Sequence, residues 1–198
     1  MEVTSPPRFD RAQLALRIVL AIVLAWLGIT AGWLVGVLYG VLPLFAAIAI
    51  SSIGRDRYLQ EAGPRMWRVL AWLLQLSSFM ILLVDRFPAG GEHPVRIEIR
   101  CTGNPTVGSA LARLVTSIPS GFVLCVLGFV SSVLWLIAAL LVLIGGTVSP
   151  SILGFQRGVL RWAARLVAYH ASLVEEYPPF SFDTGDGQGT PLAAAGAR

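Results

Sequence analysis

Three long stretches of the sequence carry no charged side chain, and they constrain the fold more than any other feature. They are residues 18–54, 69–84 and 114–156, and every Arg, Asp and Glu lies outside them. The hydrocarbon core of a bilayer takes about 20 helical residues. The whole chain is only 13% charged and 56% hydrophobic, whereas a soluble domain is about a quarter charged. The sequence excludes a water-soluble globular enzyme and predicts an all-α membrane protein.

The lengths of these stretches suggest how they cross the membrane. A single helix over residues 18–54 would be about 55 Å long, too long for one crossing, so we expect two spans with a turn at Thr30–Trp33. In residues 114–156 the candidate turn is Gly128–Ser132. One kinked, tilted helix is the alternative there, because the apolar part is short for two spans and contains Pro119. The prediction is two hydrophobic hairpins, 14–53 and 110–146, with about four transmembrane helices.

The two halves of the chain agree when one is shifted by 90 residues. Trp72 then matches Trp162, and Phe87-Pro88 matches Tyr177-Pro178. Each hairpin is followed by an exit helix, predicted over 64–85 and 152–175, that stops before an aromatic-Pro pair. The predicted organisation is a first membrane unit at 1–90, a second at 91–182 and a disordered tail at 183–198.

The two exit helices differ in charge. Arg157, Arg161 and Arg165 recur every four residues and share one face opposite an apolar face, which is typical of an amphipathic helix lying in the membrane interface. These arginines are candidate contacts for anionic lipid headgroups. The alternatives are a solvated face on a helix packed against the chain's own core, and plain topology determination. Residues 69–84 have no charged stripe, so the repeat favours an interfacial helix there and hydropathy favours a span.

One extramembrane segment has the pattern of a strand. Side chains alternate strictly from Val95 to Cys101, which predicts a short strand near 94–101. Such a strand needs a partner. Residues 2–4 or another protein could supply it.

The second exit helix and the segment after it carry a recognisable pattern. Arg161-Trp162, Arg165, Ala168-Tyr169 and Glu175-Glu176-Tyr177-Pro178-Pro179-Phe180 resemble the Arg-Trp…Arg…Ala-Tyr…Tyr-Pro-Pro-Phe signature of a bacterial integral-membrane family classed as a domain of unknown function. The resemblance covers residues 94–182, with a degenerate second copy in 1–90. It implies a membrane location and this helix order, and it supplies no activity. The candidate partner-facing residues are Trp162, Tyr169, Tyr177, Pro178, Pro179 and Phe180.

The remaining patterns give little chemistry. Gly28, Gly32, Gly36 and Gly40 would form one smooth helix face, suited equally to dimer contact and to packing within the chain. His170 lies on the apolar side of its helix without a second ligand, and the two His and two Cys are too scattered to hold a metal. No catalytic, cofactor-binding or metal site is predicted.

These observations favour a multi-pass protein of the bacterial cytoplasmic (inner) membrane. Because the basic residues flank the uncharged stretches, both termini are predicted to be cytoplasmic. The expected function is non-enzymatic, an accessory or scaffold protein acting through the cytoplasmic leaflet and partner proteins. The alternative is a lipid-handling or transport component. The expected partners are membrane lipids, with anionic headgroups plausible, and another membrane protein or a second copy of the chain, but not nucleic acid.

Overall fold

The computed structural model describes residues 2–27, 31–89, 94–96, 99 and 104–178, apart from the side chains of residues 2, 31–35 and 96. These residues are mostly helical. The helices are α1 (Arg11–Trp26), α2 (Ala31–Ile53), α3 (Arg55–Arg57), the π-helical turn η1 (Tyr58–Ala62), α4 (Gly63–Met80), α5 (Val107–Thr116), α6 (Ile118–Gly145) and α7 (Pro150–His170). Two short strands, β1 (Glu2–Val3) and β2 (Val95–Arg96), pair antiparallel.

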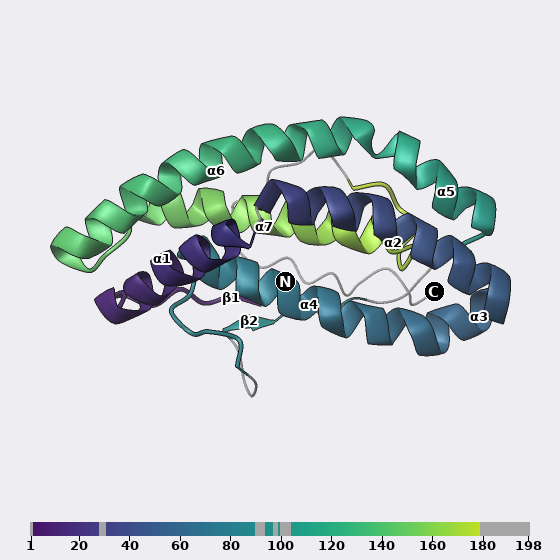
Figure 1. Cartoon of the computed structure of the whole chain (residues 1–198), viewed down its shortest axis with the longest axis horizontal. Coiled ribbons are helices and arrows are strands. Elements are labelled where there is room, and N and C mark those ends of the chain that lie inside the picture. The colour runs from purple at the N-terminus through teal and green to yellow at the C-terminus, as the bar shows by residue number, and fades with distance from the viewer. Residues whose placement is uncertain (1, 28–30, 90–93, 97–98, 100–103, 179–198) are drawn as a thin grey trace, which may run out of the picture.

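Helix α7 lies at the centre of the bundle. It contacts α2, α4, α5 and α6, and α6 arches along one side of it while α4 lies on the other (Figure 1). The main core joins α7 to α4 through buried leucines and alanines, among them Leu70, Leu74, Leu160 and Ala164. The apolar face predicted for the second exit helix is therefore covered by this chain's own helices.

The first hairpin prediction is wrong, because residues 14–53 run from one end of the bundle toward the other. The chain just before α1 lies beside the end of α6, where the Phe9 amide donates to the Gly146 carbonyl at 2.7 Å. The end of α2 lies beside the start of the second unit, where Arg55 donates to Asn104. Figure 1 shows α1 and α2 following each other along the bundle. Of the predicted turn at Thr30–Trp33, residue 30 is outside the described part and Ala31 already begins α2.

The second predicted turn is also wrong. Helix α6 runs unbroken through Gly128–Ser132, so the alternative of one long helix is the one observed. The break comes earlier, at Ser117, which ends α5 and precedes Pro119 in the first turn of α6. Proline is tolerated in that first turn because the amide it lacks would have no helical partner there.

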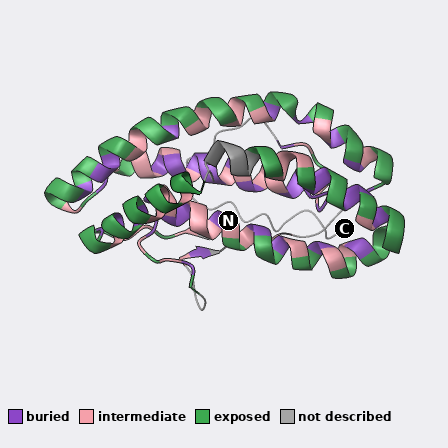
Figure 2. Ribbon diagram, in the orientation of Figure 1, coloured by how far each residue is buried: buried purple, intermediate pink, exposed green. Residues whose placement is uncertain are grey.

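Two helices of the described part are long and apolar enough to cross a membrane, and four are not supported. The apolar windows are Gly36–Ile53 and Ile118–Gly145, of which only 28% and 22% are buried. Most of the length of α6 is exposed (Figure 2). The core helix of a soluble protein would be mostly buried, so these surfaces need a different explanation.

The predicted strand near 94–101 is reduced to two paired residues. Val95 faces Val3 and Arg96 faces Glu2, so residues 2–4 supply the partner, while Ile99 is not in a strand. The other residues of the predicted strand from 97 to 101, and the predicted tail, lie outside the described residues.

Candidate functional site

The ends of α4 and α7 have the same geometry, 90 residues apart. Both helices end in a left-handed residue that is not glycine, Leu82 at φ 61° and Ser172 at φ 54°. In each, the next amide bonds the carbonyl five residues back, at 3.0 Å for Leu83 and 3.1 Å for Leu173, as in a Schellman motif. The helices therefore stop about five residues before the predicted ends at 85 and 175.

A buried arginine caps the end of α4. Arg17 of α1 is fully buried. It donates from Nε to the Phe79 carbonyl and from Nη2 to the Val84 carbonyl, both at 2.6 Å, and Nη2 also pairs with Asp85 Oδ1 at 3.0 Å. Its guanidinium lies 4.2 Å from the centre of the Phe79 ring. A cation at this position is stabilised by the negative end of the helix dipole.

A second buried arginine caps the end of α7 in the same way. Arg113 of α5 donates to the carbonyls of Tyr169 and of Val174, the latter at 3.0 Å. These acceptors lie 90 residues after those of Arg17. Its guanidinium lies 4.5 Å from the centre of the Tyr169 ring. The acid differs, because Glu175, the counterpart of Asp85, accepts from the Asn104 amide at 3.2 Å instead.

Burial sets the electrostatics of both caps. Desolvation lowers the pKa of Arg17, and the hydrogen bond and charge of Asp85 oppose it. Desolvation also lowers the pKa of Arg113, opposed by Tyr169 and Glu175. The sequence patterns did not single out these arginines. A signal existed, since each lies seven residues after a helix N-cap, Asp10 or Thr106, and these caps are offset by 96 residues.

The offset of 96 also relates two aromatic residues, each of which contacts the other unit. Trp135 of α6 donates from Nε1 to the Met80 carbonyl at 2.7 Å. Its counterpart Tyr39 of α2 packs against His170, the counterpart of Met80, with the ring centres 4.5 Å apart and the planes tilted by 55°. Each unit therefore places an aromatic side chain of its long helix against the end of the other unit's exit helix.

A polar network surrounds the end of α7. Ser117 Oγ lies 2.9 Å from His170 Nε2 and 3.0 Å from the Tyr39 hydroxyl. The Tyr39 hydroxyl donates to the Leu114 carbonyl at 2.6 Å. His170 Nδ1 lies 3.1 Å from the Leu166 carbonyl, which can only accept, so Nδ1 carries a proton. Burial lowers the pKa of His170, the hydrogen bond to the Leu166 carbonyl opposes this, and the charge of nearby Arg113 lowers the pKa further.

At the equivalent end of α4, apolar residues replace the hydroxyl and imidazole groups of this network. Ser117 corresponds to Ala21 at the offset of 96, and Tyr169 and His170 correspond to Phe79 and Met80 at the offset of 90. Both ends also have a pair of aromatic rings in edge contact: Phe79 with Phe87 at 5.5 Å and Tyr169 with Tyr177 at 5.4 Å. The polar groups of the second unit are therefore not needed to build this kind of helix end.

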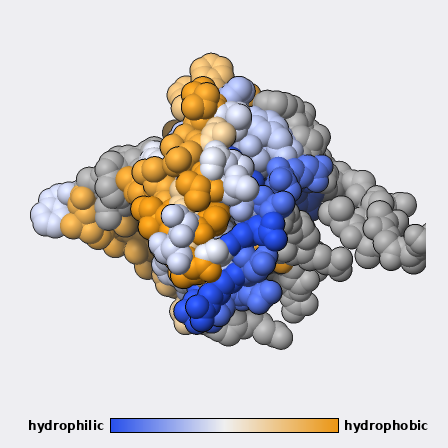
Figure 3. Space-filling model, turned by 90° about the vertical axis from the view of Figure 1, so that its right-hand side faces the viewer, coloured by the Kyte–Doolittle hydropathy of each residue, from blue (hydrophilic) through white to orange (hydrophobic). Residues whose placement is uncertain are grey.

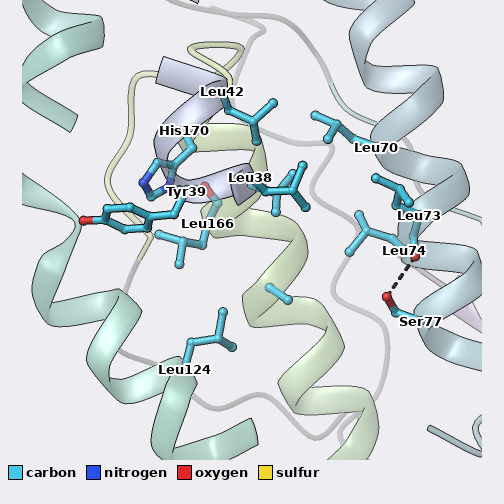
Figure 4. Close-up of a pocket in the computed structure, with 12 residues that line it drawn as sticks. Leu38, Tyr39, Leu42, Leu70, Leu73, Leu74, Ser77, Leu124, Leu166 and His170 are labelled. Carbon is cyan, nitrogen blue, oxygen red and sulfur yellow. Dashed lines mark hydrogen bonds between the residues drawn. The ribbon is translucent and has the colours of Figure 1, made fainter. Parts of the chain in front are cut away.

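An apolar pocket adjoins the network. Figure 4 shows leucines of α4 facing α2 and α7, with Leu124 of α6 and the rings of Tyr39 and His170 at the edges. The cavity volume is about 110 Å³. The polar atoms of Ser77, Tyr39 and His170 are all bonded within the protein, so the pocket offers a ligand mainly carbon surface.

The Ser117–His170 pair does not have the geometry of a hydrolase nucleophile. Ser117 is fully buried, and the far nitrogen of His170 is held by a backbone carbonyl where such sites place an acid. Within the described ranges, no three His, Cys, Asp or Glu side chains are grouped to hold a metal ion.

The arginines predicted to contact lipid lie in a row on α7. Arg157, Arg161 and Arg165 are all half-buried. Of the glycine series, Gly36 and Gly40 face open space, because a Cβ built on either would meet nothing within 4 Å. Packing within the chain therefore does not explain these two. Residue 28 and the surroundings of residue 32 are outside the described part.

Most of the predicted partner-facing residues face inward. Trp162 and Tyr169 are 6% and 8% exposed, Pro178 is buried, and Tyr177 is half-buried with its hydroxyl 2.6 Å from Ser120 Oγ. These four residues take part in the packing around α7 in this chain, and a partner-facing role for them stays a prediction. Residues 179 and 180 lie outside the described residues.

Comparison with known proteins finds a family that is similar to the second unit. No curated protein and no solved structure matches the chain. The matching family model covers α5, α6, α7 and the exit of α7, and it begins after the predicted strand. Residues 108–181 match the DUF4389 family, described as a domain of unknown function.

Proposed function

We propose that this chain is an integral membrane protein without a catalytic site, which serves as an accessory or scaffold protein through its contacts with lipid and partner proteins. The observation that carries the proposal is the exposure of α2 and α6, whose apolar windows are mostly uncovered by the chain itself. Phe122, Phe129 and Ile144 of α6 are 71%, 72% and 81% exposed. Contiguous apolar surface of this extent suits a lipid environment.

The membrane location is tested with one charge placed at two depths. Phe129 lies near the middle of α6 and Ile144 near its end. An aspartate costs about 3 kcal/mol at the centre of a bilayer and much less near the interface. We expect Phe129→Asp to lose membrane integration, measured by alkaline carbonate extraction, and the matched Ile144→Asp to keep it. Equal behaviour of both variants, or release of the wild type by carbonate, contradicts the proposal.

The accessory role is tested by composition after mild purification. A scaffold protein keeps a stoichiometric protein partner in mild detergent. The association with this partner should be weakened by Val95→Pro, which disrupts the β1–β2 pair. Recovery of a clean monomer contradicts the role.

We place the protein in the cytoplasmic membrane of a bacterium with both termini in the cytoplasm. Support comes from the two apolar helices, because an even number of crossings places both termini on the same side of the membrane. Cysteines introduced at residues 5 and 190 should resist an impermeant thiol reagent in intact cells. Labelling of either from outside contradicts this topology.

We further infer that the two units are copies of one ancestral unit. The inference is supported by the paired arginine caps, the paired left-handed residues and the exchanged Tyr39 and Trp135 contacts, all related by fixed offsets.

A second candidate, lipid handling, is favoured by the apolar pocket between α2, α4, α6 and α7. One acyl chain suits a lining of leucines and ring faces. A photoactivatable fatty acid should label the α4 face of the pocket, and Leu74→Trp should block labelling by filling it. Unchanged labelling in that variant contradicts the candidate.

A further inference from the structure

The outward face of α4 combines two cations with apolar surface. Arg65, Arg68, Val69 and Trp72 line one shallow groove, and their spacing of three, four and seven residues puts them on the same helix face. All four are exposed. The basic end and the apolar end of this groove are separated by about two helical turns, roughly 10 Å.

The charges of Arg65 and Arg68 are not neutralised by the acids that precede them in the chain. Arg55 pairs with Asp56 at 3.0 Å and Arg57 pairs with Glu61 at 3.1 Å, so the nearest acids are already engaged. Within the part of the chain that the structure describes, neither Arg65 nor Arg68 has a hydrogen-bond or ion-pair partner. The groove is therefore positive and complementary to an anion.

Its apolar end is held in place. The Trp72 indole donates from Nε1 to the Pro88 carbonyl at 2.9 Å, which fixes a ring that is 44% exposed, beside Val69 at 61%. Tryptophan is enriched where a membrane meets water. The equivalent residues of α7, Val159 and Trp162, are buried, so this open face belongs to the first unit.

Along the chain, an apolar helix and then a charged segment precede the groove. Helix α2 ends at Ile53, the paired charges of α3 and η1 follow, and α4 begins ten residues later. Viewed from the α3 end, a hydrophilic band borders a hydrophobic face (Figure 3). This continuity favours an anion that is itself anchored in a bilayer.

We infer that Arg65 and Arg68 bind the phosphate of an anionic membrane phospholipid whose glycerol and upper acyl chains lie on Val69 and Trp72. The inference rests on the proposed membrane location. Two arginines near an anionic surface correspond to roughly a 30-fold preference over a zwitterionic lipid.

The test uses Trp72 as the reporter. The full chain, purified in mild detergent, is titrated with brominated phosphatidylglycerol or brominated phosphatidylcholine, which quench tryptophan fluorescence on contact. We expect phosphatidylglycerol to quench at about 30-fold lower concentration, and Trp72→Phe to remove this high-affinity component.

The matched variants separate a site from general surface charge. Arg65→Gln/Arg68→Gln should reduce the preference to near unity. Arg55→Gln/Arg57→Gln removes the same charge from the same region and should preserve it. Equal losses in the two variants, no lipid preference in the wild type, or full competition by inorganic phosphate or glycerol phosphate would overturn the inference. Carbonate extraction of the wild type and of each variant tests membrane location separately from lipid binding. A wild type that is integrated in the membrane but shows no lipid preference refutes the lipid site alone.

Discussion

Replacing Arg113 by methionine should destabilise the chain by about 3 kcal/mol. The guanidinium is buried and donates to two carbonyls at the end of α7. Methionine fills similar volume but leaves both carbonyls without that donor, at about 1–3 kcal/mol each. The variant recovers part of this cost, because it no longer buries a charge. A net loss of about 3 kcal/mol lowers the melting temperature of a chain of this size by about 6–12 °C.

Thermal unfolding in detergent, followed by intrinsic fluorescence, measures this change. Arg113→Lys is the matched control, since it keeps the charge but lacks the planar fork that reaches two acceptors, and it should lose about half as much. Arg17→Met should lose at least as much as Arg113→Met, because it also removes the ion-pair partner of Asp85. The two methionine changes share no partner, so their effects should add. A melting temperature of Arg113→Met equal to or above that of the wild type would refute the reasoning, since burial of the cation would then cost as much as its hydrogen bonds contribute.

Two further predictions concern the same region. Gly63→Ala should destabilise by about 1–3 kcal/mol, because its Cβ would lie 2.7 Å from Leu173 Cδ2 and 3.2 Å from the Tyr58 carbonyl oxygen; the control Gly108→Ala, with nothing within 4 Å of the new Cβ, should be neutral or stabilising in the same melting assay. The lowered pKa of His170 means that the unfolded chain binds this proton more tightly, so stability should fall as the pH drops below about 6.5 and continue falling to the folded-state pKa. His170→Gln should remove that component of the pH dependence, and an unchanged pH profile would contradict it.

The composition and the uncharged stretches were enough to predict a mostly helical chain with long apolar helices. They could not locate the helix breaks. Gly128–Ser132 has the small and polar residues of a turn, yet α6 passes through it, because helical hydrogen bonding satisfies the backbone of such residues wherever no competing contact stops the helix. Ser117 stops a helix because Pro119 follows it and its hydroxyl bonds the Arg113 carbonyl. That contact is a local hydrogen bond from a side chain to the backbone, which hydropathy does not record.

The site was harder to predict for a related reason. The spacing of Arg157, Arg161 and Arg165 predicted a basic face on α7. The buried cations are instead Arg17 and Arg113, whose sequence positions are those of ordinary charges flanking an apolar stretch. What distinguishes them is a pair of carbonyls from residues 56 or more positions away. A sequence pattern within one helix carries no information about acceptors supplied by another.

The end of α4 can serve as an internal control for the end of α7. Wherever the second unit has Ser117, Tyr169 or His170, the first has Ala21, Phe79 or Met80 in an equivalent position, capped by the same kind of arginine. When a residue of one helix end is replaced by its counterpart from the other end, the new side chain enters surroundings of a kind in which it already packs in this molecule. Transplanting the apolar set into the second unit therefore separates what its hydroxyls and imidazole contribute to function from what they contribute to shape, without reference to any other protein.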